Sequence, residues 1–327
     1  MEKRTLGRSD IAVSALGFGC WAIGGEWQGG DGQPLGWGAV DDAESERAIL
    51  RAIELGVTFF DTADVYGTGH SEEVLGRAVA GRRSEVVIAS KWGNLFDAGT
   101  RTAGPGPDVT PGYARRALTD TLRRLSTDYL DLYQFHINEG PLDAAAELRD
   151  ACEEFVAEGL IRAYGWSTDD PERARLFAQG PHCATVQMNC NVLQDAPDML
   201  ALCDELNLAA INRGPLAMGV LTGKYASGAA LPSGDIRATP PPWLTLFRDG
   251  GVAPEWQARF DAVRDILTSG GRTPAQGALA WLWARSPRTV PIPGIRTVAQ
   301  AEQNAGALRF GPLTAEQMKE IETLLGR

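Results

Sequence analysis

The chain has 327 residues, 44% of them hydrophobic and 22% charged, which is the composition of a globular protein with a large core. Its 42 acidic and 31 basic residues give a formal net charge of −11 without a basic stripe, so nucleic acid is not an expected partner. No apolar run approaches the roughly 18 to 20 residues of a membrane span, and we expect a cytoplasmic protein with no membrane partner.

The cysteines give no sign of an oxidised or zinc-bound framework. They are five, an odd number, and no two of them form a Cys-x-x-Cys pair: Cys20, Cys152, Cys183, Cys190 and Cys203. This pattern argues against both a disulfide framework and a structural zinc site. We expect reduced thiols that mostly serve as small packing residues.

Taken in chain order, the sequence alternates apolar runs with amphipathic segments. It opens with a predicted β-hairpin, residues 4–6 and 11–13, turned at Gly7-Arg8-Ser9-Asp10. Eight predicted strands follow, at residues 15–19, 57–60, 86–90, 130–135, 161–165, 185–188, 208–211 and 289–292. Helical patterns lie between them, for example at residues 44–55 and 114–125, and Thr314 with Gln317 predicts a capping box before a final helix.

Continuous apolar strands in alternation with helices indicate a parallel sheet covered by helices. Eight such units predict an α/β fold, a (β/α)8 TIM barrel, with an N-terminal β-hairpin and an extra C-terminal helix. The length alone would allow two domains, but a barrel of this size is normal, and we predict a single domain over residues 1–327. No Gly-x-Gly-x-x-Gly motif follows a strand, so the classical dinucleotide fold lacks its signature.

Barrel enzymes carry their chemistry at the C-terminal ends of the strands, where four reactive side chains recur. Asp61 ends the second predicted strand, Tyr66 lies on the loop after it, and Lys91 and His136 end the next two strands. A neighbouring ammonium would lower the phenol pKa from its ordinary value near 10. Asp61 would hold Lys91 charged, and His136 would orient a carbonyl oxygen or relay its proton. Alone, each residue could be a turn cap, an exposed lysine or a core histidine, but together they predict proton transfer.

The segments around these residues resemble the catalytic segments of the aldo-keto reductase family. They are FFDTADVYG at residues 59–67, the pair Ser90-Lys91 and LYQFH at residues 132–136, and the resemblance extends from Leu6 to residues 291–294. It implies a barrel that reduces aldehydes or ketones with NADPH. In that reaction Tyr66 protonates the developing alkoxide, and Asp61, Lys91 and His136 support it.

The same resemblance assigns residues to NADPH/NADP+ binding. They are Gly19, Trp21, Ser167, Thr168, Gln187, Arg213, Gly214, Pro215, Leu216, Gly219, Lys224, Gly294, Arg296, Gln300, Gln303 and Asn304. Thr168 stands where the family usually has Asn beside Ser167 at the nicotinamide carboxamide, which Gln187 is expected to hold. Arg213 stands where many relatives stack an aromatic ring on the nicotinamide. A guanidinium plane can stack as well, although a surface ion pair is the alternative.

The adenosine end of the cofactor is expected at residues 292–304. This segment is predicted to open a helix directly after the eighth strand, so that its N-terminus faces an anion. Arg296 would pair with the 2′-phosphate, with a solvated helix residue as the alternative. Gln300 and Asn304 would face the adenosine, and Gln303 replaces a Glu common in the family.

Two long loops, residues 21–42 and 224–254, are predicted to wall the pocket. Trp27 and Trp92 would form part of an apolar substrate wall, although tryptophans in such loops are as often packing residues. Trp281 and Trp283 lie in a helical pattern and are predicted core residues. The sequence thus predicts a small-molecule carbonyl substrate, without identifying it, and leaves the oligomeric state open.

The same residues allow two alternative classes of function. A metal-dependent hydrolase could use Asp61, Asp64, His70, His136 and Glu139, but the chain has three histidines and no His-x-His pair, so no metal is predicted. A cofactor-binding redox sensor or regulatory subunit with little turnover, of the kind that the potassium-channel β subunits represent, is the second alternative. The presence of all four predicted catalytic side chains favours an enzyme over this role.

Overall fold

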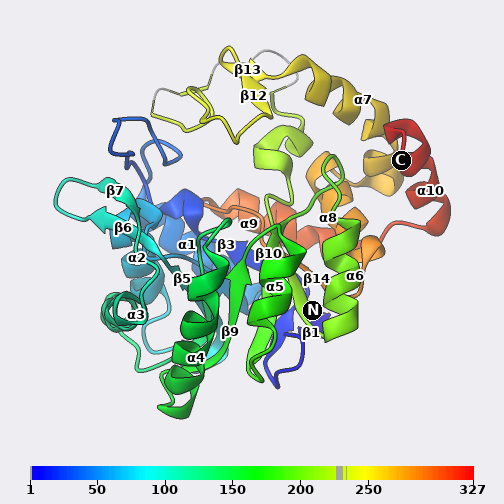
Figure 1. Cartoon of the computed structure of the whole chain (residues 1–327). Helices are drawn as coiled ribbons and strands as arrows, with labels where there is room; N and C mark the ends of the chain where they lie inside the picture. The colour runs from blue at the N-terminus through cyan, green and yellow to red at the C-terminus, as the bar shows by residue number, and fades with distance from the viewer. Residues whose placement is uncertain (1, 226–230, 233) are drawn as a thin grey trace.

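The computed structural model describes residues 2–225, 231–232 and 234–327. Residues 226–230 and 233, in the predicted long loop 224–254, lie outside the described residues. All eight predicted strands occur in one parallel sheet, in the order β14-β11-β10-β9-β8-β5-β4-β3 (Figure 1). Their bounds are β3 Gly17–Gly19, β4 Phe59–Asp61, β5 Val87–Trp92, β8 Leu130–Phe135, β9 Ile161–Ser167, β10 Cys183–Asn189, β11 Ala209–Arg213 and β14 Thr289–Pro291.

The first and last strands of this sheet meet at a glycine and close the barrel. The backbone of Gly19 donates to the carbonyl of Pro293 at 3.0 Å and accepts from the amide of Ile295 at 3.3 Å. A Cβ at position 19 would lie 2.7 Å from the carbonyl oxygen of Ile292, so only glycine allows this approach. The predicted (β/α)8 barrel is therefore confirmed.

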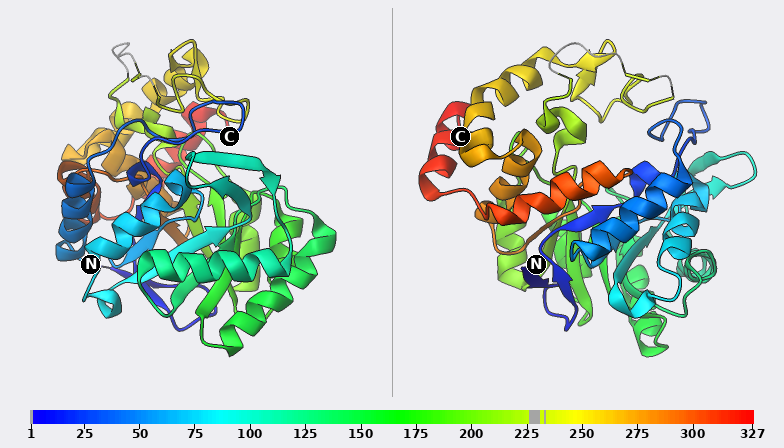
Figure 2. Two further views of the ribbon diagram at one scale, coloured as in Figure 1. Left: turned by 90° about the vertical axis from the view of Figure 1, so that its left-hand side faces the viewer. Right: turned by 180° about the vertical axis from the view of Figure 1, so that it is seen from behind.

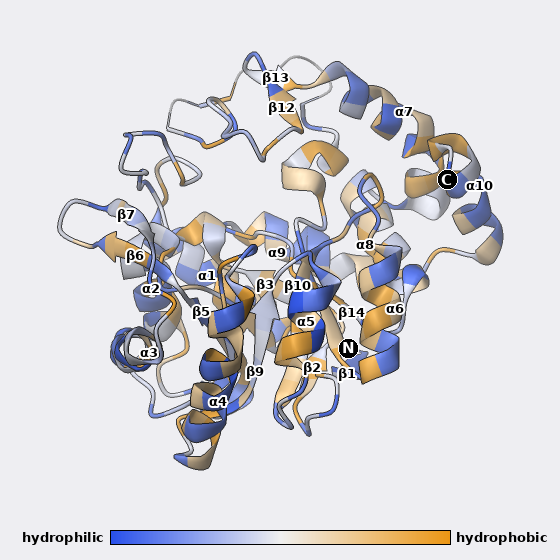
Figure 3. Ribbon diagram, viewed as in Figure 1, coloured by the Kyte–Doolittle hydropathy of each residue, from blue (hydrophilic) through white to orange (hydrophobic). Residues whose placement is uncertain are grey.

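Helices surround the barrel, and their polar faces point outward (Figures 2 and 3). They are α1 Asp42–Glu54, α2 His70–Ala78, α3 Pro111–Leu125, α4 Leu142–Ala157, α5 Pro171–Phe177, α6 Pro197–Leu206, α8 Pro274–Arg285 and α9 Val298–Gly306. Two residues define the start of α3: the hydroxyl of Thr110 accepts from the amide of Tyr113, and Pro111 takes the first helical position. Trp281 and Trp283 are buried on α8, as predicted.

Additions to the barrel lie at both of its ends. The predicted hairpin is β1 Lys3–Thr5 with β2 Ala12–Ser14, and its flanking residues Leu6 and Ile11 are buried among the inward-facing side chains of the strands. The final helix α10 Ala315–Leu325 begins with the predicted capping box. It packs against α7 Pro254–Thr268, a helix that the sequence analysis did not predict.

Two small hairpins above the barrel were also not predicted. They are β6 Asn94–Asp97 with β7 Thr102–Pro107, and β12 Phe247–Arg248 with β13 Gly251–Val252. The Gly- and Pro-rich sequence of β7 signals a turn, but a strand in a two-stranded ribbon leaves one edge unpaired, where proline costs no hydrogen bond. The five cysteines are buried free thiols, as predicted. Among the described residues, no helix is long and apolar enough to cross a membrane.

Candidate active site

The four predicted catalytic residues converge at one end of the barrel. The fully buried ammonium of Lys91 donates to Oδ1 of Asp61 at 2.6 Å, to the carbonyl of Thr62 at 2.7 Å and to Oη of Tyr66 at 3.3 Å. These contacts use the three N–H donors of a lysine. Because the oxygen of Tyr66 accepts from Lys91, the phenol keeps its own hydrogen for a different acceptor.

Two glutamines hold the other side of Asp61. Its Oδ2 accepts from Nε2 of Gln187 at 2.8 Å and from Nε2 of Gln134 at 3.1 Å. Gln187, which is expected at the nicotinamide, thus uses its amide nitrogen to bind Asp61. Gln134 was missed. It lies two residues before His136 on β8, and the alternation of side chains in a strand would have placed both on the inner face.

The electrostatics of Tyr66 differ from the expectation. Burial raises the pKa of the phenol above its ordinary value, and the neighbouring Lys91 offsets only part of this rise. The direction of the lysine's effect was predicted correctly, but the net effect is an acid that stays protonated. Burial also acts to lower the pKa of Lys91, yet Asp61 and Tyr66 outweigh it, so the lysine stays charged.

His136 follows β8, and its ring lies nearly perpendicular to that of Tyr66, with centroids 5.6 Å apart and planes at 81°. Burial lowers its pKa well below the ordinary value, and the positive charges of Lys91 and Arg213 lower it further. Its Nδ1 is buried without a hydrogen-bond partner among the described residues. A neutral imidazole of this kind can orient an oxygen without adding charge.

The tryptophans divide into two groups. Trp21 stacks on Tyr66 at 5.9 Å and 18°, and Trp27 is buried in the cluster that contains Val65 and contacts Tyr66. Trp92 is fully buried with its ring 4.3 Å from that of Tyr133, so the prediction that it lines the pocket is wrong. Because Lys91 points into the barrel, the next residue of the strand points outward, toward the helices.

The residues expected around the nicotinamide lie on three adjacent strand ends. Ser167 is the register partner of Gln187, so the two lie side by side on β9 and β10. The hydroxyl of Thr168 donates to the carbonyl of Asn138 at 2.8 Å and is therefore engaged in holding the loop after β8. Arg213, half-exposed at the end of β11, forms an ion pair with Asp169.

The loop after β11 has an unusual backbone. Ala217, Met218 and Gly219 all have positive φ, 48°, 53° and 97°, a strain that non-glycine residues adopt mainly where function requires it. With Gly214, Pro215 and Leu216, this loop was predicted to cover the cofactor pyrophosphate. Its end presents Lys224, whose pKa is lowered to about 8 by desolvation and by the charges of Arg237 and Arg296.

Arg237 is a further cation that the sequence analysis missed, since no local motif marks it. It lies near Gly219, because a Cβ at that position would be 3.2 Å from Nη1 of Arg237. Three positive side chains, Lys224, Arg237 and Arg296, therefore share one region. This group of cations fits an anionic cofactor.

The start of α9 differs from the prediction. The helix begins at Val298 rather than directly after β14. Backbone amides at its start, which were expected to face an anion, are already hydrogen-bonded to side chains of the protein. Glu44 accepts from the amide of Val298 at 2.9 Å, and the side chain of Gln300 accepts from the amide of Arg296 at 2.9 Å. The backbone is thus less available to a phosphate than expected, which leaves the side chain of Arg296. Within the helix, Asn304 is buried and Gln303 is exposed. Gly294, which lies before the helix, is also exposed.

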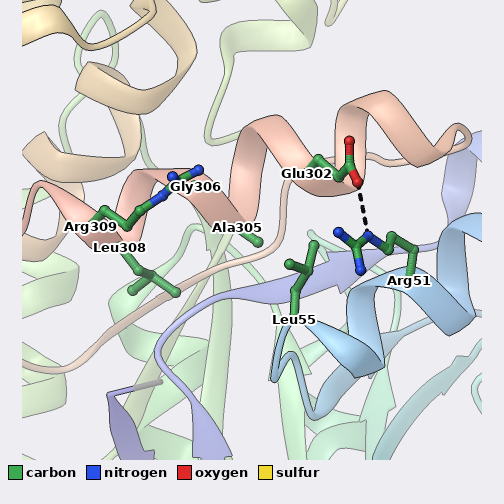
Figure 4. Close-up of a pocket in the computed structure, with 7 residues that line it drawn as sticks. All are labelled: Arg51, Leu55, Glu302, Ala305, Gly306, Leu308 and Arg309. Carbon is green, nitrogen blue, oxygen red and sulfur yellow. Dashed lines mark hydrogen bonds and ion pairs between the residues drawn. The ribbon is translucent and has the colours of Figure 1, made fainter.

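Other parts of the molecule offer less. A groove between α1 and α9 is lined by Arg51, Leu55, Glu302, Ala305, Gly306, Leu308 and Arg309, with Arg51 paired to Glu302 (Figure 4). The described residues contain no cluster of three or more metal-binding side chains. Asp64 is buried, neither of its carboxyl oxygens has a hydrogen-bond partner among the described residues, and burial and Glu72 raise its pKa.

A barrel that brings Tyr66, a buried lysine and a cationic loop region to the same end is the arrangement that the resemblance predicts for an oxidoreductase of the carbonyl-reducing class. The family model described as "Aldo/keto reductase family" matches residues 15–325, and the chain belongs to that family. It is therefore an oxidoreductase of that family.

Individual relatives agree with this assignment. The chain is 35% identical to the uncharacterized oxidoreductase YqkF of Bacillus subtilis, over 99% of this chain and 96% of YqkF. Among solved structures, it resembles the holo form of an aldo-keto reductase from Bacillus halodurans with a TM-score of 0.77 and 29% identity, over 99% and 96% of the two chains. It resembles an aldo-keto reductase from Klebsiella pneumoniae in complex with NADPH with a TM-score of 0.71 and 28% identity, again over 99% and 96%.

Proposed function

We propose that this protein reduces aldehyde or ketone carbonyls to alcohols, with Tyr66 as the proton donor. The observation that carries the proposal is the direction of one hydrogen bond: Lys91 donates to the oxygen of Tyr66. The phenol hydrogen is then free to point at a carbonyl oxygen in the pocket. We treat residues 1–327 as one domain that carries this activity.

The chemistry divides between cofactor and protein. NADPH, when bound, supplies the hydride that reaches the carbonyl carbon. Tyr66 gives its proton to the carbonyl oxygen as negative charge develops there, and the resulting phenolate is stabilised by the ammonium of Lys91 at 3.3 Å. Asp61 holds that ammonium in place, and neutral His136 orients the carbonyl oxygen.

The cofactor would lie across the ends of β9, β10, β11 and β14. Ser167 and Gln187 would flank the nicotinamide, and Arg213 would leave Asp169 to stack on it. The strained loop at Gly219 and the side chain of Lys224 would hold the pyrophosphate. Arg296 would pair with the 2′-phosphate, and Gln300 and Asn304 would lie beside the adenosine. The neighbouring cations support this placement, because the ligand is a multiple anion.

The test is NADPH oxidation over a panel of aliphatic and aromatic aldehydes, ketones, dicarbonyls and sugar-derived carbonyls. Tyr66→Phe keeps the ring but removes the proton, and we expect turnover to fall at least about 100-fold with NADPH affinity nearly unchanged. Tyr129→Phe is the matched control, because Tyr129 precedes β8 at the opposite end of the barrel. A Tyr66→Phe variant that keeps more than about a tenth of the turnover would contradict the assignment. Tight NADPH binding without turnover on any carbonyl would instead favour a sensor.

A further inference from the structure

The two long loops above the barrel meet at Trp37. This residue forms a backbone bridge with Asp235, and the amide of Ile236 donates to the carbonyl of Gly36 at 2.9 Å. The two partners are about two hundred residues apart in the chain, so the contact joins the loop after β3 to the segment before α7. The loop after β3 also carries Trp21, which covers Tyr66.

Trp37 contacts both arginines on the cofactor side. The guanidinium carbon of Arg237 lies 4.5 Å from the centre of the indole ring, and Nη1 of Arg296 donates to the carbonyl oxygen of Trp37 at 3.1 Å. Arg237 is itself fixed by Asp235 through two hydrogen bonds, 2.8 and 2.5 Å long. Both members of that ion pair are at least 95% buried, so the platform under Trp37 is rigid and shielded from water.

On its other side, Trp37 contacts the tryptophan that covers the catalytic tyrosine. Its ring meets that of Trp21 edge to face at 5.3 Å and 83°, and Trp21 stacks on Tyr66 at 5.9 Å and 18°. Such aromatic pairs contribute beyond the area that they bury. Trp21 has one further anchor, the hydrogen bond from its Nε1 to the carbonyl of Leu35 at 3.1 Å.

The backbone that follows Tyr66 is irregular. The two residues that follow it, Gly67 and Thr68, have positive φ, 60° and 57°, in a short 3₁₀ turn. Three neighbours contact the ring: Trp21 stacks on it, the ring of His136 packs nearly perpendicular to it, and Lys91 lies 4.8 Å from the ring centre. A proton donor must be held within about 0.5 Å and 10 to 20° of its productive geometry.

We propose that Trp37 is a positioning residue: resting on Arg237 and Asp235, it holds Trp21 against Tyr66 and so fixes the orientation of the catalytic phenol. The proposal rests on the proposed function of Tyr66 as proton donor. It also implies that the same residue which anchors Arg296 steadies the reaction centre.

The kinetic test compares three variants with wild type. Trp37→Ala removes the ring, Trp37→Phe keeps an aromatic face, and Trp243→Ala removes an exposed tryptophan from the same segment as Arg237. With NADPH saturating, we expect Trp37→Ala to lower kcat by about 10-fold or more, because a small misplacement can cost up to about 100-fold. Trp37→Phe should keep about half of kcat or more, since the ring contact persists. Trp243→Ala should stay within about two-fold of wild type.

Two results would overturn the proposal. One is a kcat of Trp37→Ala within two-fold of wild type, and the other is a loss of kcat in Trp37→Ala that is equally present in Trp37→Phe. A second measurement keeps it testable even if no carbonyl is turned over. All nine tryptophans can be labelled with 5-fluorotryptophan, and the ¹⁹F resonance of Trp21 can be assigned with Trp21→Phe.

We expect the Trp21 resonance to move toward that of the exposed Trp243 in Trp37→Ala and to keep its position in Trp37→Phe. An unchanged Trp21 resonance in Trp37→Ala would refute the positioning role whatever the activity. Absence of NADPH oxidation by wild type would instead refute the proposed function, so the two failures remain distinguishable.

Discussion

Removal of the charge on Lys91 should destabilise the fold as well as stop catalysis. Its ammonium is fully buried and lies 2.6 Å from Asp61, a carboxylate that is 1% exposed. Lys91→Met fills a similar volume but leaves that carboxylate in the interior with only Gln134 and Gln187 as donors. Breaking a buried ion pair in this way costs about 3 to 5 kcal/mol. This is a large part of the roughly 5 to 15 kcal/mol that separates folded from unfolded domains.

The double variant Asp61→Asn/Lys91→Met decides whether this reasoning is right. It removes both charges, so no uncompensated carboxylate remains, and its loss of stability should be smaller than the sum of the two single losses by more than about 1 kcal/mol. The catalytic losses should likewise fail to multiply, because Asp61 acts through Lys91.

Guanidinium unfolding at pH 7, followed by tryptophan fluorescence, gives the free energies of unfolding. Lys319→Met on the exposed face of α10 is the control, with an expected change within about 0.5 kcal/mol. Additive losses in the double variant, or a loss below about 1 kcal/mol in Lys91→Met, would show that the pair does not act as a buried unit.

Three further predictions follow from the charged groups. Arg296→Ala should weaken NADPH binding by about 10- to 150-fold, the effect of one charge-assisted hydrogen bond, and leave NADH binding nearly unaffected in fluorescence titrations. Equal weakening of both cofactors would mean that Arg296 supports the loop conformation rather than binding the 2′-phosphate. His136 has a pKa lowered by burial, so the unfolded chain binds more protons below about pH 6.5 and stability falls as the pH decreases. His136→Gln should flatten that acid-side slope in urea unfolding. Asp64 has a pKa raised by burial, so stability falls as the pH rises above about 4, and Asp64→Asn should be the more stable protein at pH 8. A less stable Asp64→Asn variant would mean that the carboxyl group has a partner.

The sequence predicted the strands and the convergence of the four candidate catalytic residues because both depend on local order. Asp61, Lys91 and His136 stand at successive strand ends, and a closed parallel barrel must bring such ends together. Trp92 was assigned to a loop because the third strand was predicted to end at residue 90, whereas β5 extends to Trp92 and alternate strand residues point in opposite directions.

Apart from Gln134 on β8, the residues that the sequence analysis missed depend on loop conformation. Arg237 and Trp37 meet only because two loops cross above the barrel, and no spacing within either loop predicts that contact. The start of α9 was misplaced for a related reason. The carboxylate of Glu44, about 250 residues earlier, accepts a hydrogen bond from the first amide of α9. A residue distant in sequence therefore satisfies the free N–H group at the helix start.

The closure of the barrel at Gly19 has a consequence for how the protein opens. β3 pairs with β4 along its whole length but joins the other end of the sheet through the hydrogen bonds of Gly19 with Pro293 and Ile295. This seam is where local opening should need the least free energy. Gly19 on one side of the seam and residues 292–304 on the other are both expected to contact NADPH, so opening must also release the ligand, which adds about 4 kcal/mol at a thousand times Kd. Cofactor binding would then stabilise the closed barrel, and hydrogen exchange at the amides of Gly19 and Ile295 would slow when NADPH binds.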